Sequence, residues 1–185
     1  MRTTDTITTY KGIMESKVSI GLINPKSPDN VSAVMRAAGN FRVDSVFYTG
    51  KRYPRALMRN HDIPDMSRKV SQNIPLSEAA SLLDEAAMGT QIVCVEFAEN
   101  AISLPDYQHP QNAMYIFGPE DGTISQDVID RANAVVYVPT VGCMNLGATV
   151  NVVLYDRLLK SSQSYESNDL IRQSRDTNNR LKVSE

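Results

Sequence analysis

The sequence has no tryptophan, only two cysteines and two histidines among 185 residues, and no long apolar run. Cys94 and Cys143 lie far apart and show no metal-ligand spacing, so we expect reduced thiols and no metal site. No stretch is apolar over the length needed to cross a bilayer, and residues 1–16 are polar, without the apolar segment of a secretory signal. These absences predict a cytoplasmic protein without a membrane part.

Charge of one sign is also lacking overall, because the formal net charge is only −2. Binding to nucleic acid would therefore depend on a local basic patch. Residues 51–69 offer one, with six basic residues against two acidic ones, and Tyr48 and Tyr53 lie within or beside it. Basic side chains meet phosphates and aromatic rings stack on unpaired bases, so this stretch is a candidate RNA-binding segment. The alternative is a solvated loop that happens to be basic.

Apolar runs and helical spacings alternate along the chain. The runs predict strands over residues 18–23, 45–48, 91–97, 114–117 and 134–138. Helical patterns predict a first helix that begins at Val31 and further helices over residues 76–87, 125–132 and 146–160. Residues 51–75 and the polar tail are predicted to be irregular. Strands without a polar alternate face indicate a mostly parallel sheet covered by helices on both faces. We therefore predict one α/β domain over residues 17–160, between a flexible arm (1–16) and a polar tail (161–185).

Ligands of open α/β sheets bind at the carboxyl ends of the strands. Three loops here follow such ends: residues 24–30, 118–122 and 139–147. The first leads into the predicted helix that carries Arg36, six residues after Asn30 and therefore less than two turns away. Both side chains could face the strand ends. Alternatively, Asn30 only caps the helix and Arg36 is a surface charge.

The second and third loops contain glycine. Gly118 and Gly122 permit close approach of the backbone to a ligand, or they serve a tight turn. The third loop is nearly uncharged and precedes an apolar helix, so its backbone N–H groups could bind the polar edge of a ligand. Cys143 lies in this loop with no histidine nearby in sequence, and we expect a buried structural thiol rather than a nucleophile.

Together, the three loops resemble the ordered motifs of the SpoU/TrmH branch of the SPOUT methyltransferases. The matching residues are Asn24-Pro25, Asn30, Arg36-Ala37-Ala38 and Phe41; Phe117-Gly118-Pro119-Glu120 with Gly122 and Ile124; and Val138-Pro139, Cys143-Met144-Asn145-Leu146 and Tyr155-Asp156. The resemblance covers about residues 18–160. The sequence departs from the family at Ser32, which is usually glycine, at Cys143, which is usually serine, and in a shorter third loop.

The resemblance implies a SAM-dependent RNA methyltransferase that modifies a ribose 2′-hydroxyl. It also implies a deep C-terminal trefoil knot and a homodimer, with the site completed near the subunit interface, to which the helix over 146–159 would contribute. The implied partner is RNA, with tRNA slightly favoured over rRNA. The implied catalytic residues are Arg36, Asn30, Glu120 and Asn145. The implied cofactor contacts are Val95, Glu96, Gly118, Val138, Cys143 and Leu146. The basic stretch would supply Lys51, Arg52, Arg55 and Arg59 to bind RNA.

Two other functions are compatible with the sequence. The altered third motif also fits a catalytically silent knotted protein that binds RNA. A Rossmann-type nucleotide enzyme fits less well, because no Gly-x-Gly-x-x-Gly run follows the first strand. In the methyltransferase, Arg36 would stabilise charge and position the hydroxyl, because a guanidinium does not lose its proton near neutral pH.

Overall fold

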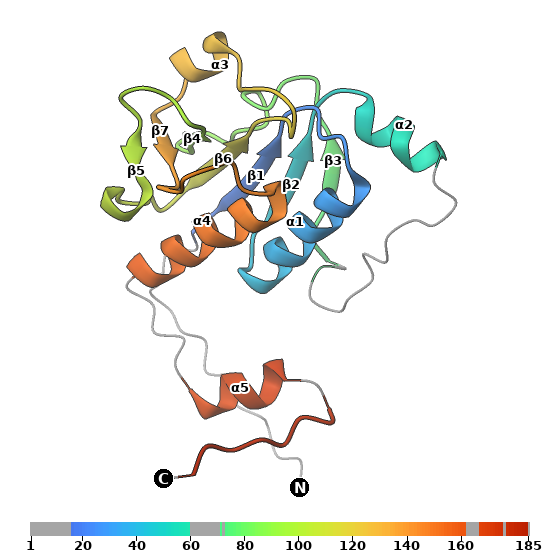
Figure 1. Cartoon of the computed structure of the whole chain (residues 1–185), viewed down its shortest axis with the longest axis vertical. Coiled ribbons are helices and arrows are strands. Elements are labelled where there is room, and N and C mark those ends of the chain that lie inside the picture. Colours follow the sequence, from blue (N-terminus) through green and yellow to red (C-terminus); the bar gives the residue numbers. More distant parts are fainter. Residues whose placement is uncertain (1–15, 60–70, 72, 162–166, 176, 185) are drawn as a thin grey trace, which may run out of the picture.

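The computed structural model describes residues 16–59, 71, 73–161, 167–175 and 177–184, and within them the chain forms a seven-stranded sheet (Figure 1). The strand order is β3-β2-β1-β6-β4-β7-β5, and every neighbouring pair is parallel. The strands are β1 (Val18–Leu22), β2 (Ser45–Tyr48), β3 (Leu76–Glu78), β4 (Gln91–Val95), β5 (Ile102–Ser103), β6 (Ala113–Phe117) and β7 (Ala134–Tyr137). The predicted parallel α/β sheet is confirmed.

The helices are α1 (Pro28–Asn40), α2 (Arg52–Arg59), α3 (Gln126–Asp130), α4 (Leu146–Lys160) and α5 (Asn168–Ser174), with a 3-10 turn η1 (Leu104–Asp106). Side chains cap the two helices that border the functional site. Ser27 Oγ accepts from the N–H of Asn30 at the start of α1, and Asn145 Oδ1 accepts from the N–H of Gly147 at the start of α4. No helix in the described ranges is long and apolar enough to span a membrane.

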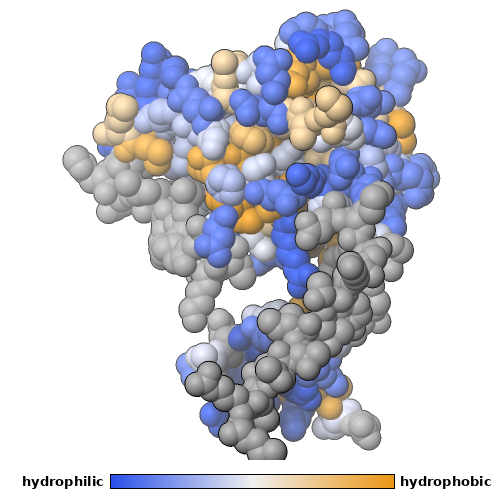
Figure 2. Space-filling model, turned by 180° about the vertical axis from the view of Figure 1, so that it is seen from behind, coloured by the Kyte–Doolittle hydropathy of each residue, from blue (hydrophilic) through white to orange (hydrophobic). Residues whose placement is uncertain are grey.

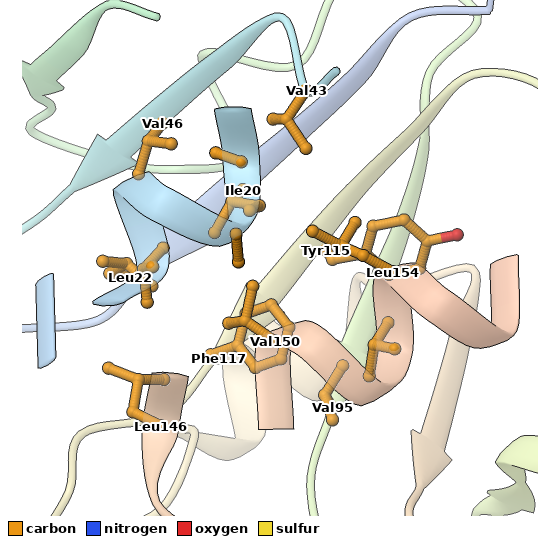
Figure 3. Close-up of a cluster of buried hydrophobic side chains, with 14 of the residues drawn as sticks. Ile20, Leu22, Val43, Val46, Val95, Tyr115, Phe117, Leu146, Val150 and Leu154 are labelled. Carbon is orange, nitrogen blue, oxygen red and sulfur yellow. The ribbon is translucent and has the colours of Figure 1, made fainter. Parts of the chain in front are cut away.

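Helices α1 and α4 pack against each other on one face of the sheet (Figure 1). The apolar layer below them is built around the central strands. Ile20 and Leu22 of β1, and Phe117 of β6, meet Val150 and Leu154 of α4 there (Figure 3). All five residues of β6 are buried, as a strand covered on both faces requires.

The opposite face is covered by a chain segment without helix, which carries Ala79 and Leu82, and by Val128 and Ile129 of α3. Residues 76–87 were predicted to form a helix, and that prediction is wrong: Leu76–Glu78 form β3 beside β2, and turns follow. The helix-like spacing of apolar residues was misleading, because Ala79 and Leu82 are buried against the sheet although the segment that carries them is not helical. Pairing with β2 satisfies the backbone of this edge segment, which outweighs its helical propensity. Seen from behind, the domain is mostly polar, with smaller apolar areas between the polar side chains (Figure 2).

Two helices occur where none was predicted. Helix α2 lies in the stretch expected to be irregular, and that prediction is wrong for Arg52–Arg59. Pro54 does not break this helix because it sits in the first turn, where the backbone N–H has no partner within the helix. Helix α5 lies in the polar tail, where Ser167 caps it, and it is separate from the sheet in Figure 1. The rest of the basic stretch, with Arg68 and Lys69, and the arm up to residue 15 lie outside the described residues.

A buried histidine ties the end of α4 to β6. His109 Nε2 lies 2.8 Å from Asp156 Oδ2, and its Nδ1 lies 2.6 Å from Tyr115 Oη. Because a carboxylate only accepts, Nε2 carries the proton and the Tyr115 hydroxyl donates to Nδ1. Burial raises the pKa of Tyr115 to about 12, so this donor keeps its proton. Arg157 donates to Tyr115 Oη and Lys160 to Asp156, which completes the network.

This network predicts that acid weakens the fold. Burial lowers the pKa of His109, with the bond to Asp156 opposing this in part. The contribution of neutral His109 is therefore fully present above its unfolded pKa of about 6.5 and is lost as the pH falls through the lower folded pKa. Denaturant titrations across this range should show the free energy of unfolding decreasing with pH, and decreasing less in His109→Gln. Identical pH dependence in both proteins would contradict the assignment.

Candidate functional site

A pocket opens at the carboxyl ends of β4, β6 and β7. Its walls come from the loops after these strands and from the starts of α1 and α4. The lining residues are Asn30, Val95, Glu96, Phe97, Phe117, Gly118, Pro119, Glu120, Gly122, Tyr137, Val138, Thr140, Cys143, Met144, Asn145, Leu146 and Thr149. The three loops singled out in the sequence thus meet in one cavity, as the parallel sheet requires.

The six residues expected to contact a cofactor all line this pocket: Val95, Glu96, Gly118, Val138, Cys143 and Leu146. Apolar side chains and two carboxylates share its walls. The sequence reasoning missed Phe97 and Tyr137, whose rings lie 6.1 Å apart at the pocket. Their positions at the ends of β4 and β7 were the available signal, because strand ends meet there.

Three of the four residues expected to be catalytic form one hydrogen-bonded chain. Asn30 Nδ2 donates to Glu120 Oε1 at 3.1 Å, and Asn145 Nδ2 donates to Asn30 Oδ1 at 2.7 Å. Glu120 also accepts from the backbone N–H groups of Lys26 and Ser27, at 2.9 and 3.1 Å. One carboxylate therefore joins the first loop to the second, and Asn30 joins both to the start of α4.

The charge state of Glu120 follows from these bonds. Partial burial opposes its ionisation, but the N–H donors of Asn30, Ser27 and Lys26 outweigh burial and hold the pKa of Glu120 below its usual value. Glu120 is thus a carboxylate with its oxygens engaged near neutral pH. This suits a group that holds loops and neighbouring side chains in place.

Arg36 lies apart from this chain of contacts. It is exposed on α1 and does not line the pocket. Among the described residues, no hydrogen bond joins it to Asn30, Glu120 or Asn145, which bond to one another instead. The catalytic role assigned to Arg36 from the sequence stays a prediction.

Glu96 is fixed at the floor of the second loop. Its Oε2 accepts from the N–H of Ile124 at 3.0 Å, and its Oε1 accepts from the N–H of Phe97 at 2.9 Å. A Cβ on Gly118 would lie 3.2 Å from Glu96 Oε2 and 3.3 Å from Ile124 Cγ1. A side chain at position 118 would therefore crowd Glu96 and Ile124, and glycine avoids this contact at the pocket wall.

The two cysteines differ in a way that the sequence did not show. Both thiols are free. Cys94 is buried, and burial raises its pKa to about 12, so it stays a thiol. Cys143 was expected to be buried, and this is wrong: it is exposed in the third loop. Since that loop follows β7 at the pocket rim rather than entering the core, its small side chains face the solvent.

The four candidate RNA-binding residues lie directly before α2 and within it. Lys51 pairs with Glu78, and Arg52 makes a bidentate pair with Asp121. Arg55 and Arg59 are exposed, and no other residue in the described ranges forms an ion pair with them. Arg52, Arg55 and Arg59 therefore lie on α2 and Lys51 directly precedes it, and Lys51 and Arg52 are already engaged in ion pairs.

The start of α2 is fixed to the first loop by Asn24. The backbone N–H of Arg52 donates to Asn24 Oδ1 at 3.4 Å, and Asn24 itself has a φ of 43°. Gly50 adopts a φ of 78°, and a Cβ there would lie 2.2 Å from Asn24 Oδ1. Gly50 thus allows the turn that brings α2 to the pocket side of the sheet.

A parallel sheet with a mixed polar and apolar pocket at its strand ends defines an α/β protein with a candidate site for a small ligand. The family model of the SpoU rRNA Methylase family matches residues 17–155. The chain belongs to this family.

Solved structures share the fold at low sequence identity. The A. aeolicus TrmH/SpoU tRNA modifying enzyme is 16% identical, with a TM-score of 0.65 over 85% of either chain. A protein studied for 2-OH methylation of C/U34 on tRNA is 18% identical, with a TM-score of 0.66 over 79% of this chain and 97% of that one. The SpoU methyltransferase AviRb from Streptomyces viridochromogenes, in complex with the cofactor AdoMet, is 16% identical, with a TM-score of 0.64 over 80% of this chain and 59% of that one. A search of curated proteins gives no significant match.

Proposed function

We propose that this protein transfers a methyl group from SAM to a ribose 2′-hydroxyl of RNA. The observation that carries the proposal is the meeting of three distant motifs at one pocket, joined through Asn30, Glu120 and Asn145. Two fold relatives support the substrate and the cofactor: one is studied for 2-OH methylation on tRNA, and one holds AdoMet.

The pocket suits SAM by its chemistry. Val95, Val138 and Leu146 offer apolar surface for an adenine ring. The carboxylates of Glu96 and Glu120 complement a positively charged sulfonium, and Gly118 allows close backbone approach. SAM supplies an electrophilic methyl group bonded to sulfur, so the reaction needs no metal.

The residues around the methyl group would position the nucleophile. When bound, SAM would supply the methyl group for the ribose oxygen and leave as S-adenosylhomocysteine, and the hydroxyl proton would pass to solvent. Glu120 is held by N–H donors and keeps Asn30 and Asn145 in place. Arg36 would bind the developing oxyanion or a neighbouring phosphate, since a guanidinium does not act as a base near neutral pH.

A second subunit would complete the site. Tyr155 and Leu159 of α4 are 58% and 68% exposed and lie one helical turn apart, so they present apolar surface on the same side of the helix. Arg36 is exposed on the neighbouring helix α1. A homodimer formed through α4 would cover these side chains and place Arg36 near a subunit boundary. We propose this assembly together with the C-terminal trefoil knot.

The RNA would lie along α2. Arg55 and Arg59 are exposed there, and Lys51 and Arg52 precede them on the side of the second loop. Phosphates of the backbone would meet these cations. We favour tRNA over rRNA, with the reaction in the cytoplasm.

Methyl transfer from isotope-labelled SAM to undermodified tRNA and rRNA, followed by nucleoside mapping, tests this function. We expect label in a 2′-O-methyl nucleoside at one tRNA position, because a pocket that orients one hydroxyl modifies one site. Label confined to bases would contradict the ribose assignment.

A catalytically silent RNA-binding protein is the second candidate. The altered third motif favours this candidate, since Cys143 stands where the family usually has serine and the loop is shorter. Calorimetry separates the two functions: the methyltransferase releases or absorbs heat with SAM, whereas the silent protein binds RNA and gives no heat with SAM.

A further inference from the structure

Two cations from different loops converge on one carboxylate beside the pocket. Arg52 Nη1 and Nη2 lie 2.7 and 2.9 Å from the two oxygens of Asp121. Lys26 Nζ lies 3.6 Å from Asp121 Oδ2. Lys26 comes from the loop between β1 and α1, Arg52 opens α2, and Asp121 lies in the loop between β6 and α3.

This cluster is next to the proposed reaction site. Asp121 lies between Glu120 and Gly122, which both line the pocket. The backbone N–H of Lys26 donates to Glu120, so the loop that carries Lys26 is itself fixed to the pocket wall. Lys26 and Asp121 are 64% and 51% exposed, and a ligand in solution can therefore reach them.

The Arg52–Asp121 pair is not required to place α2. Asn24 already accepts the backbone N–H of Arg52, and Tyr53 is buried under the helix. Exposed ion pairs contribute little to stability in general. Little stability would therefore be lost if another anion replaced Asp121 beside the two cations.

We propose that Lys26 and Arg52 form a binding site for one phosphodiester of RNA, and that Asp121 occupies this site when RNA is absent. The inference rests on the proposed function, because it assumes an RNA substrate. A guanidinium binds carboxylate and phosphate through the same two-pronged geometry, so Asp121 stands where two phosphate oxygens would lie. Lys26 adds a second positive charge, 3.6 Å from Asp121 Oδ2.

The site also explains how RNA would be held at the pocket. RNA bound along α2 would bring a phosphodiester to Arg52, and Asp121 would have to leave. The carboxylate released is the neighbour of Glu120 in the second loop. Asp121 thus makes RNA binding weaker than the two cations alone would allow.

The test measures affinity for a fluorescent single-stranded RNA by anisotropy, using the full chain. Asp121→Asn should bind about fivefold more tightly than wild type, since the internal competitor loses its charge. Lys26→Gln and Arg52→Gln should each bind about fivefold more weakly. When Arg52→Gln is already present, adding Asp121→Asn should no longer give most of this gain in RNA affinity. Asp84→Asn is the matched control, because it makes the same charge change on an exposed turn and should leave affinity within about twofold.

The outcomes separate this inference from the proposed function. Equal or weaker RNA binding by Asp121→Asn, with melting temperature and SAM binding unchanged, would overturn it while wild type still methylates RNA. If Asp121→Asn does not fold, wild-type affinity in Lys26→Gln would overturn it as well. Absence of RNA binding by wild type would instead overturn the inference and the RNA substrate together.

Discussion

Replacing Arg36 with alanine should lower the rate of methyl transfer to RNA by at least about a hundredfold, while the Kd for SAM stays within about twofold of wild type. The side chain is exposed and does not line the pocket, so its loss removes no pocket contact. Its charge would act only on the oxygen that attacks the methyl group, or on a phosphate next to it. Single-turnover transfer from labelled SAM measures the rate, and calorimetry measures the Kd.

Two variants make this result specific to Arg36. Arg36→Lys keeps the charge but loses the two-pronged hydrogen bonding, so it should recover only part of the rate. Arg131→Ala removes the same charge from an exposed position at the end of α3 and should retain the wild-type rate. Full activity in Arg36→Ala would show that the sequence motif does not mark the catalytic arginine in this chain.

The fold could be predicted where burial and local preference agree. The apolar runs of β1 and β6 gave parallel strands, and α4 began and ended at the residues expected. Burial and local helical preference disagreed over residues 76–87. Leu82 is buried against side chains of the sheet, such as Ile116, and not as part of a helix. The sequence alone gives no sign of these distant contacts. The two-residue strand β5 carries too short a pattern to detect.

The candidate site could be predicted in position but not in its contacts. The strand ends brought the three loops together, since parallel strands share one carboxyl edge. The sequence could not show that Asn30, Glu120 and Asn145 bond to one another rather than to Arg36. Nor could it show that Asp121 takes Arg52, because residues 69 positions apart carry no local pattern.

Replacing Gly118 with valine should weaken SAM binding at least about tenfold and lower methyl transfer with it. A Cβ at this position already lies 3.2 Å from Glu96 Oε2, so the two further methyl groups of valine would crowd the pocket wall that Gly118 helps to form. Calorimetry with SAM measures the loss of affinity. We expect the variant to fold, because strand β6 ends before Gly118. A melting curve checks this.

Gly142→Val is the matched control for this prediction. Gly142 lies in the third loop outside the pocket lining, and a Cβ there meets no atom within 4 Å. It adds the same side chain near the same cavity, so SAM binding should stay within about twofold of wild type. Wild-type SAM affinity in Gly118→Val would place the cofactor elsewhere than in this pocket. Combined with Arg36→Ala, this variant would separate two steps of the proposed reaction: we expect Gly118→Val to impair SAM binding and Arg36→Ala to impair methyl transfer from bound SAM.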